Sequence, residues 1–135
     1  MRIQNAVVHH VGVAFRYEDD VQPVRIWNTT VGAAVTRAFR GANARGSRLD
    51  VRNLLLLGGA LPAEAAGPSN LAVKPSSFVN AAGNDYRLAA GSPAIDQGVA
   101  LTEVPTDRAN VKRPQGAAYD IGAYERPASH PGGRR

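Results

Sequence analysis

Three segments along the chain repeat one short pattern of apolar and polar residues. The pattern alternates between apolar positions and positions of any type, and it ends in asparagine. An apolar residue, Met1, Val24 or Leu49, stands directly before each copy. The three copies are Arg2-Ile3-Gln4-Asn5, Arg25-Ile26-Trp27-Asn28 and Asp50-Val51-Arg52-Asn53. Alternation with a period of two predicts a half-buried strand in each copy. The terminal asparagine favours a turn, because this residue tolerates a left-handed backbone better than most.

The spacing of the copies predicts how their strands associate. The asparagines stand at positions 5, 28 and 53, and a fourth copy without asparagine is expected at residues 71–73. A repeat of 22 to 25 residues holds about three strands of the usual length plus turns. Stacked repeats would pair their strands in parallel and bring equivalent side chains above one another. The predicted interior columns are Met1, Val24, Leu49 and Leu71, then Ile3, Ile26, Val51 and Val73; the predicted amide ladder is Asn5, Asn28 and Asn53. The alternative is a β-sandwich whose strands are alike by chance.

The chain divides into three regions by composition. Residues 1–75 hold the repeats, with a loop at residues 61–70 that contains one turn of helix at residues 63–66. Residues 76–127 carry short apolar alternations separated by Gly, Pro and Asp. Residues 128–135 form a tail rich in Gly and Arg that we expect to be disordered.

Two motifs in residues 76–127 resemble a known family. They are Asn84-Asp85-Tyr86-Arg87-Leu88 followed by Gly91-Ser92-Pro93-Ala94-Ile95-Asp96-Gln97-Gly98, and Asp107 with Arg113-Pro114 followed by Asp120-Ile121-Gly122-Ala123-Tyr124-Glu125. Together with Pro75 and Phe78-Val79, these residues resemble the C-terminal region of bacterial right-handed parallel β-helix repeat proteins, which share the pectate-lyase-like fold. The chain departs from the family at Asn84, where the family has Gly, and at residues 107–110, which lack its Asp-Gly turn.

The resemblance, together with the repeat, predicts an all-β fold: a right-handed parallel β-helix (solenoid) of three to four C-terminal rungs plus a C-terminal cap. Stacked parallel strands end in an exposed edge, and a terminal block with a polar outer face covers it. Asp96 and Asp120 would accept backbone N–H groups in the turns of this cap. Because Met1 already stands in a repeat strand, we expect upstream rungs of a longer chain, or a covering partner, at the N-terminal edge.

Composition narrows the classes of partner. The net charge is +5, and most of the 16 basic residues are arginines, which favours nucleic acid, anionic lipid or acidic polysaccharide. The chain has no cysteine, which excludes disulfides, thiolate metal sites and cysteine nucleophiles. Its longest apolar run, residues 54–57, is far shorter than the ~18 residues of a membrane span. Residues 1–15 lack the basic-then-apolar order of a signal peptide.

A basic stretch is the candidate substrate-binding segment. It contains Arg37, Arg40, Arg45, Arg48 and Arg52, offset only by Asp50. Arginine binds carboxylates and phosphates through two parallel hydrogen bonds. The resemblance adds that β-helix polysaccharide lyases commonly use an arginine or lysine as the base. The alternative is a solvated surface, as charge runs usually are.

Two further groups could bind metal ions. The run Glu18-Asp19-Asp20 supplies the oxygen ligands that calcium prefers, and β-helix lyases use calcium to bind uronates. Adjacent residues of an extended chain point in opposite directions, so a site would need Asp50 from a neighbouring repeat. The alternative is a solvated loop. His9 and His10 are expected to face opposite ways on a strand, and His130 lies in the tail, so we predict no histidine metal site.

The function implied by the resemblance is that of a secreted or cell-surface protein that binds extracellular acidic polysaccharide. Cleavage stays open, and no catalytic residue is assigned; an enzymatic parent would be a polysaccharide lyase or glycoside hydrolase. The alternative is a non-catalytic structural or adhesin-like stalk. Nucleic acid is the less favoured partner, because a basic groove for it is usually paired with stacking aromatics and only a few are scattered here. No cofactor is expected apart from the calcium alternative.

Overall fold

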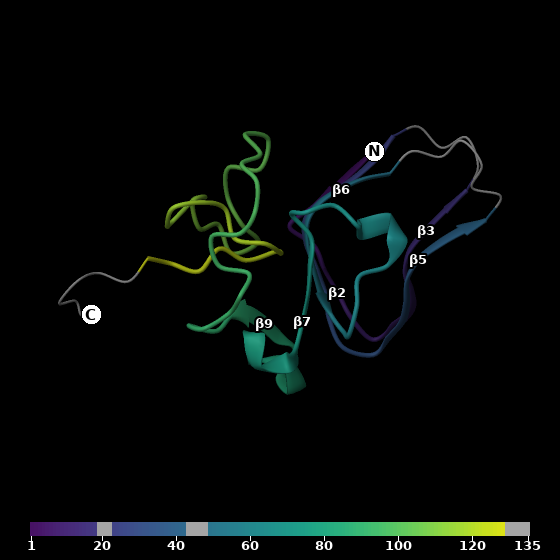
Figure 1. Cartoon of the computed structure of the whole chain (residues 1–135), viewed down its shortest axis with the longest axis horizontal. Coiled ribbons are helices and arrows are strands. Elements are labelled where there is room, and N and C mark those ends of the chain that lie inside the picture. The colour runs from purple at the N-terminus through teal and green to yellow at the C-terminus, as the bar shows by residue number, and fades with distance from the viewer. Residues whose placement is uncertain (19–22, 43–48, 129–135) are drawn as a thin grey trace.

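The repeat strands lie side by side in one parallel sheet. The computed structural model describes residues 1–18, 23–42 and 49–128. Strands β1 (Arg2–Gln4), β4 (Val24–Val31), β6 (Leu49–Leu57) and β7 (Leu71–Val73) are neighbours in that order, and β2 (Val7–Val8) also pairs with β4. All of these pairings are parallel (Figure 1). The prediction of an all-β chain with parallel pairing is therefore confirmed.

A second parallel sheet faces the first. It consists of β3 (Val11–Glu18) and β5 (Val35–Ala42), with Phe15 opposite Phe39. The rings of these two phenylalanines are 5.2 Å apart between centroids. They share one buried cluster with Ile26 and Leu54 of the first sheet. The apolar faces of the two sheets thus meet in a common core, with a corner of the chain between them (Figure 1).

The register of the first three copies follows the repeat. Ile3 pairs with Ile26, and Ile26 with Val51, so the residue that is apolar in each copy forms a column between the sheets. The three asparagines that follow have φ angles of 56°, 48° and 56°, all in the left-handed region. Each copy therefore turns at its asparagine, as the sequence indicates.

The predicted fourth copy is wrong. Leu71 pairs with Leu55 rather than with Leu49, and Val73 pairs with Leu57. Just before β7, a side chain forms hydrogen bonds with the β6 backbone groups to which a fourth strand in register would have bonded. Asn70 donates to the Val51 carbonyl oxygen at 3.0 Å and accepts the Leu54 N–H at 2.9 Å. The segment before them forms the short 3-10 helix η1 (Ala63–Ala65) at the place predicted for a helical turn.

The C-terminal region has little regular structure. The short helices η2 (Pro75–Ser77) and η3 (Ala81–Gly83) flank β8 (Phe78–Asn80), which pairs antiparallel with β9 (Asp85–Leu88). The remaining described residues, 89–128, wind along the asparagine corners of the first sheet (Figure 1). Hydrogen bonds join Thr106 to the first asparagine, Asp120 to the second and Val99 to the third. The region therefore packs against the side of all three copies and not only beside the last strand.

Candidate functional site

The outer face of the first sheet carries three arginines around one tryptophan. The guanidinium carbons of Arg2, Arg25 and Arg52 lie 5.6, 5.7 and 5.6 Å from the ring centroid of Trp27. Register explains the cluster, because Arg2 pairs with Arg25 and Arg52 pairs with Trp27. Alternation along each strand turns these positions outward when their neighbours turn into the core. We call Arg2, Arg25 and Arg52 the arginine face.

The arginine face is only partly neutralised. Arg52 donates from Nε to the Asp50 carboxylate at 2.8 Å. Arg2 and Arg25 are exposed, and among the residues that the structure describes neither forms an ion pair. Arg2 and Arg25 are register partners on neighbouring strands, whose backbones lie about 4.8 Å apart in a sheet. Each can make two parallel hydrogen bonds to one carboxylate.

Trp27 lies at the centre of these three arginines. Its side chain is 4% exposed and packs in a cluster with Leu101, Val104 and Tyr119 of the C-terminal region. A guanidinium over an indole ring gains about 0.5–1 kcal/mol at an exposed site. The C-terminal region therefore packs against Trp27, and the three guanidinium groups lie around its ring.

The structure separates the arginines that the sequence grouped together. Arg52 belongs to the arginine face, whereas Arg37 and Arg40 lie on β5 in the opposite sheet. Arg45 and Arg48 lie outside the described residues. Sequence reasoning missed Arg2 and Arg25, although both occupy the same position of the repeat. Applying the column argument to the polar positions of the repeat would have found them.

Most of the predicted calcium ligands lie outside the residues that the structure describes. Asp19 and Asp20 lie outside the described residues, as does the side chain of Glu18. Asp50, the expected partner from the next repeat, is instead paired with Arg52. Within the described part of the chain no three His, Cys, Asp or Glu side chains come together as a metal site.

A buried ion pair lies in the C-terminal region. Arg113 and Glu125 are 3.0 Å apart, and both side chains are fully buried. Arg113 also donates to the carbonyl oxygens of Asp120 and Gly122 and to the side-chain oxygen of Asn5. Burial lowers the pKa of the Arg113 guanidinium, and burial raises the pKa of the Glu125 carboxyl. The pair ties the last described residues to the first asparagine corner.

Carboxylates around this pair accept backbone N–H groups. Asp120 accepts the N–H groups of Asp96 and Arg126, at 2.8 and 2.7 Å, and burial raises the pKa of Asp120. Asp96 accepts the Ala118 N–H at 3.3 Å. Asp107 accepts three backbone N–H groups in the same way. These carboxylates are occupied by turn hydrogen bonds, which is a structural use of the family-like motifs.

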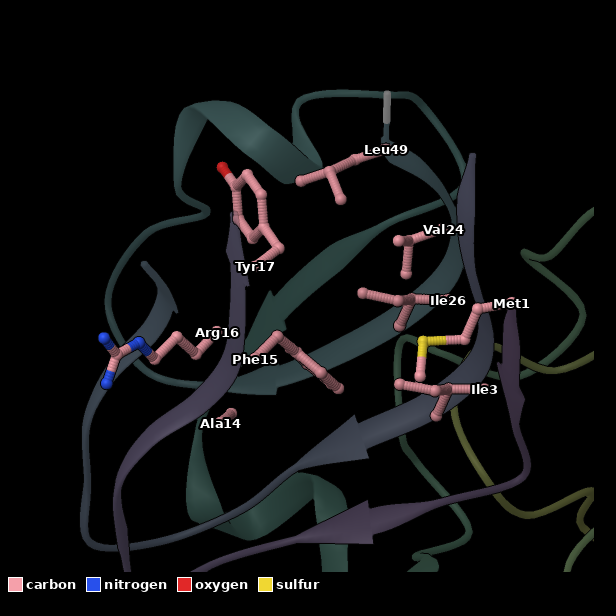
Figure 2. A pocket seen from close by; sticks show the side chains of 9 residues that line it. All are labelled: Met1, Ile3, Ala14, Phe15, Arg16, Tyr17, Val24, Ile26 and Leu49. Carbon is pink, nitrogen blue, oxygen red and sulfur yellow. The ribbon is translucent and has the colours of Figure 1, made fainter. Parts of the chain in front are cut away.

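An apolar cavity of about 480 Å³ opens between the two sheets at their first strands. Phe15 and Tyr17 of β3 line it together with Ile26, while Arg16 points away (Figure 2). Met1, at the mouth, is 79% exposed. The first-sheet side chains that line the cavity belong to the interior columns. Among the described strands, β1 pairs only with β4 and β3 only with β5, so the cavity is the open interior of the stack at its first copy.

The two adjacent histidines do not lie on a strand. They form the corner between β2 and β3, where His10 has a left-handed φ of 55°. Their Nδ1 atoms are 2.8 Å apart. The expectation that the two rings face opposite ways is therefore wrong, because a left-handed residue interrupts the alternation of an extended chain.

No protein-family model, curated protein or solved structure matches this chain. Within the described residues, no helix has the length and apolar character needed to cross a membrane.

Proposed function

We propose that the chain is the C-terminal part of a secreted or cell-surface right-handed parallel β-helix protein, and that its arginine face binds acidic polysaccharide. The observation that carries the binding proposal is the cluster of Arg2, Arg25 and Arg52 around Trp27. The cluster combines free positive charge with a fixed support, and both favour a specific anionic ligand over a diffuse counterion cloud.

The β-helix proposal draws on the register of the repeats. The proposal is supported by three copies in parallel register, each turning at a left-handed asparagine and each continuing the interior columns, as stacked rungs would. The Asn53 amide donates to the Asn28 side-chain oxygen at 3.3 Å, which joins two neighbouring copies. The open edges of β1 and β3 offer parallel pairing to further rungs or to a covering partner.

The shape of the arginine face favours an extended polymer as its ligand. Arg2 and Arg25 are neighbours across β1 and β4, whereas the neighbour of Arg25 on β6 is Asp50, and Arg52 lies two residues further along that strand. Two successive carboxylates of a chain that crosses β1 and β4 can therefore meet Arg2 and Arg25. Single-stranded nucleic acid would call for exposed aromatics on which bases stack, whereas Trp27 is 4% exposed. A carboxylated polysaccharide fits this surface better.

Binding without cleavage is the activity that these residues support. The buried carboxylates Asp107, Asp120 and Glu125 are held by backbone N–H groups and by Arg113. Carboxylates used in this way stabilise the fold, which favours the non-catalytic stalk as the second candidate function. In that candidate, the arginine face would serve adhesion.

The test measures affinity for polygalacturonate, with neutral dextran as the comparison polymer. The double variant Arg2→Gln/Arg25→Gln removes the two arginines of this face that form no ion pair among the described residues. Arg37→Gln/Arg40→Gln is the matched control on the opposite sheet. Loss of two charge-assisted contacts at about 1.5 kcal/mol each predicts at least a tenfold weaker Kd for the first variant only. Equal affinities for both polymers, or equal losses in both variants, would refute the proposal. Tighter binding of duplex DNA would favour nucleic acid instead.

A further inference from the structure

The corner between β2 and β3 presents two imidazole rings that converge on each other. The Nδ1 atoms of His9 and His10 are 2.8 Å apart, and the rings meet edge to face at 87°. The left-handed backbone of His10 produces this arrangement, because it turns the second side chain back toward the first. This corner follows β2, whereas the arginine face lies on β1, β4 and β6.

The corner is held from two sides. The His10 backbone N–H donates to the Ala33 carbonyl oxygen at 2.8 Å. The His9 ring packs against the Tyr86 ring, with 5.7 Å between centroids. The Tyr86 hydroxyl accepts the Ala33 N–H at 2.8 Å and lies 3.2 Å from the side-chain oxygen of Asn84. His9 is half-buried against this support and His10 is exposed, so one ring is fixed and the other is accessible.

We propose that His9 and His10 chelate a divalent transition-metal ion, such as Zn²⁺, Ni²⁺ or Cu²⁺, through their Nδ1 atoms. A zinc–nitrogen bond of about 2.0–2.1 Å places two ligand nitrogens of a tetrahedral site roughly 3.3 Å apart. At 2.8 Å the two nitrogens are within hydrogen-bond distance, so one of them carries the bridging proton. Metal binding requires that proton to move to the Nε2 atom of its ring and the two Nδ1 atoms to separate by about 0.5 Å, through rotation of the exposed His10 ring. Imidazole is a preferred ligand for these ions, whereas calcium takes oxygen ligands.

Two protein ligands leave part of the coordination shell to water or to an external group. Such an open site binds more weakly than a site with four protein ligands. We expect one ion per chain. Calcium and magnesium should not compete.

The experiment titrates Zn²⁺ and Ni²⁺ into the tag-free chain by calorimetry and compares three variants. His9→Gln and His10→Asn each remove one ligand, and asparagine suits the left-handed backbone of position 10. His130→Ala is the matched control, since it removes the third histidine of the chain. Circular dichroism and urea denaturation check that each variant folds. Unit stoichiometry with at least tenfold weaker binding in the first two variants, and unchanged binding in the control, is the expected result.

Three outcomes would overturn the site: no heat of binding in the parent chain, equal binding in all variants, or loss only with His130→Ala. A second readout does not depend on affinity. Bound Zn²⁺ should shift the imidazole ¹H–¹⁵N signals of both His9 and His10, and a shift of one ring alone would exclude chelation by the pair.

Discussion

The asparagine that closes each copy combines two roles in one side chain. It adopts a left-handed backbone that most residues avoid, and its amide bonds to chain segments far away in sequence. Asn53 is fully buried and donates both to Asn28 and to the Val99 carbonyl oxygen, and it accepts the Val99 N–H at 2.9 Å. Residues 5, 28 and 53 thereby fasten the C-terminal region to the sheet.

Replacing Asn53 should separate these two roles. Asn53→Gly keeps the left-handed turn but removes three side-chain hydrogen bonds, and we expect the free energy of unfolding to fall by about 2–4 kcal/mol. Asn53→Ala should cost about 1 kcal/mol more, because alanine is strained at positive φ. Urea denaturation measures both values. Asn110→Ala is the control, exposed and left-handed at a φ of 71°, and should lose only about 1 kcal/mol. Equal losses at positions 53 and 110 would contradict the role of the amide.

The buried Glu125 should give the protein an unusual dependence of stability on pH. Burial raises its pKa above the ordinary value of 4.5 in the folded state. Just above that value the folded chain holds more protons than the unfolded chain, so this group's contribution to stability falls as pH rises. The loss of stability in Glu125→Gln should therefore be largest near pH 4 and shrink toward pH 7.

The control for this prediction has the opposite sign. Hydrogen bonding to Arg87 lowers the pKa of the partly exposed Asp85. The stability that this group contributes is present above its unfolded pKa and is lost as pH falls through its folded pKa. Any loss in Asp85→Asn should therefore shrink toward low pH. Chemical denaturation at several pH values measures both trends, and parallel trends in the two variants would contradict the assignment for Glu125.

At the scale of strands, the alternation of apolar and polar residues predicted the pairing correctly where strands bond to one another through their backbones. The alternation around Ile3, Ile26 and Val51 placed three strands in their observed register. It failed at residues 71–73, because the side chains of Ser69 and Asn70 bond to β6 in place of a strand. A pattern of apolar and polar residues does not show where a side chain, in place of a neighbouring strand, will hydrogen-bond to the backbone.

The candidate sites show the same limit. A run of arginines close in sequence suggested one surface, yet Arg37 and Arg52 lie in different sheets. Arg2 and Arg25 meet because equivalent positions of stacked strands are neighbours. The two rings of His9 and His10 meet because His10 has a left-handed φ angle. Histidine seldom adopts such an angle, and the neighbouring residues do not predict it.

The contact between β9 and the corner after β4 depends on one glycine. A Cβ on Gly32 would overlap the ring of Tyr86, which is 1% exposed and anchors β9. Gly32→Ala should therefore lower the free energy of unfolding by about 1–3 kcal/mol, as overpacking of a filled site does. Gly59→Ala is the control, since nothing lies within 4 Å of its Cβ, and should change stability by no more than about 0.5 kcal/mol. Thermal unfolding compares them, and similar melting temperatures would argue against the contact.

For the whole molecule, the two ends of the stack differ. At the last strand, the region from β8 onward packs against the sheet, and Leu55, Val73 and Tyr86 share a buried cluster. At the first copy, β1 and β3 each have one unpaired side among the described strands, and the apolar cavity opens between them. Unpaired edges beside apolar surface are places where chains associate.

This asymmetry predicts that the isolated chain self-associates through its first strands, and that one lysine at that edge weakens the association. Val11 on β3 is 38% exposed, and Val99 in the C-terminal region is 41% exposed. Val11→Lys places a charge on the open edge, as natural edge strands do, whereas Val99→Lys adds the same charge elsewhere.

Sedimentation velocity over a range of concentrations should show the parent chain and Val99→Lys forming larger species, with Val11→Lys shifted toward the monomer. If both lysine variants dissociate equally, net charge is the cause. If the parent chain stays monomeric at high concentration, the predicted association is wrong. Dissociation by Val11→Lys alone places the contact at the edge where we propose that further rungs pair.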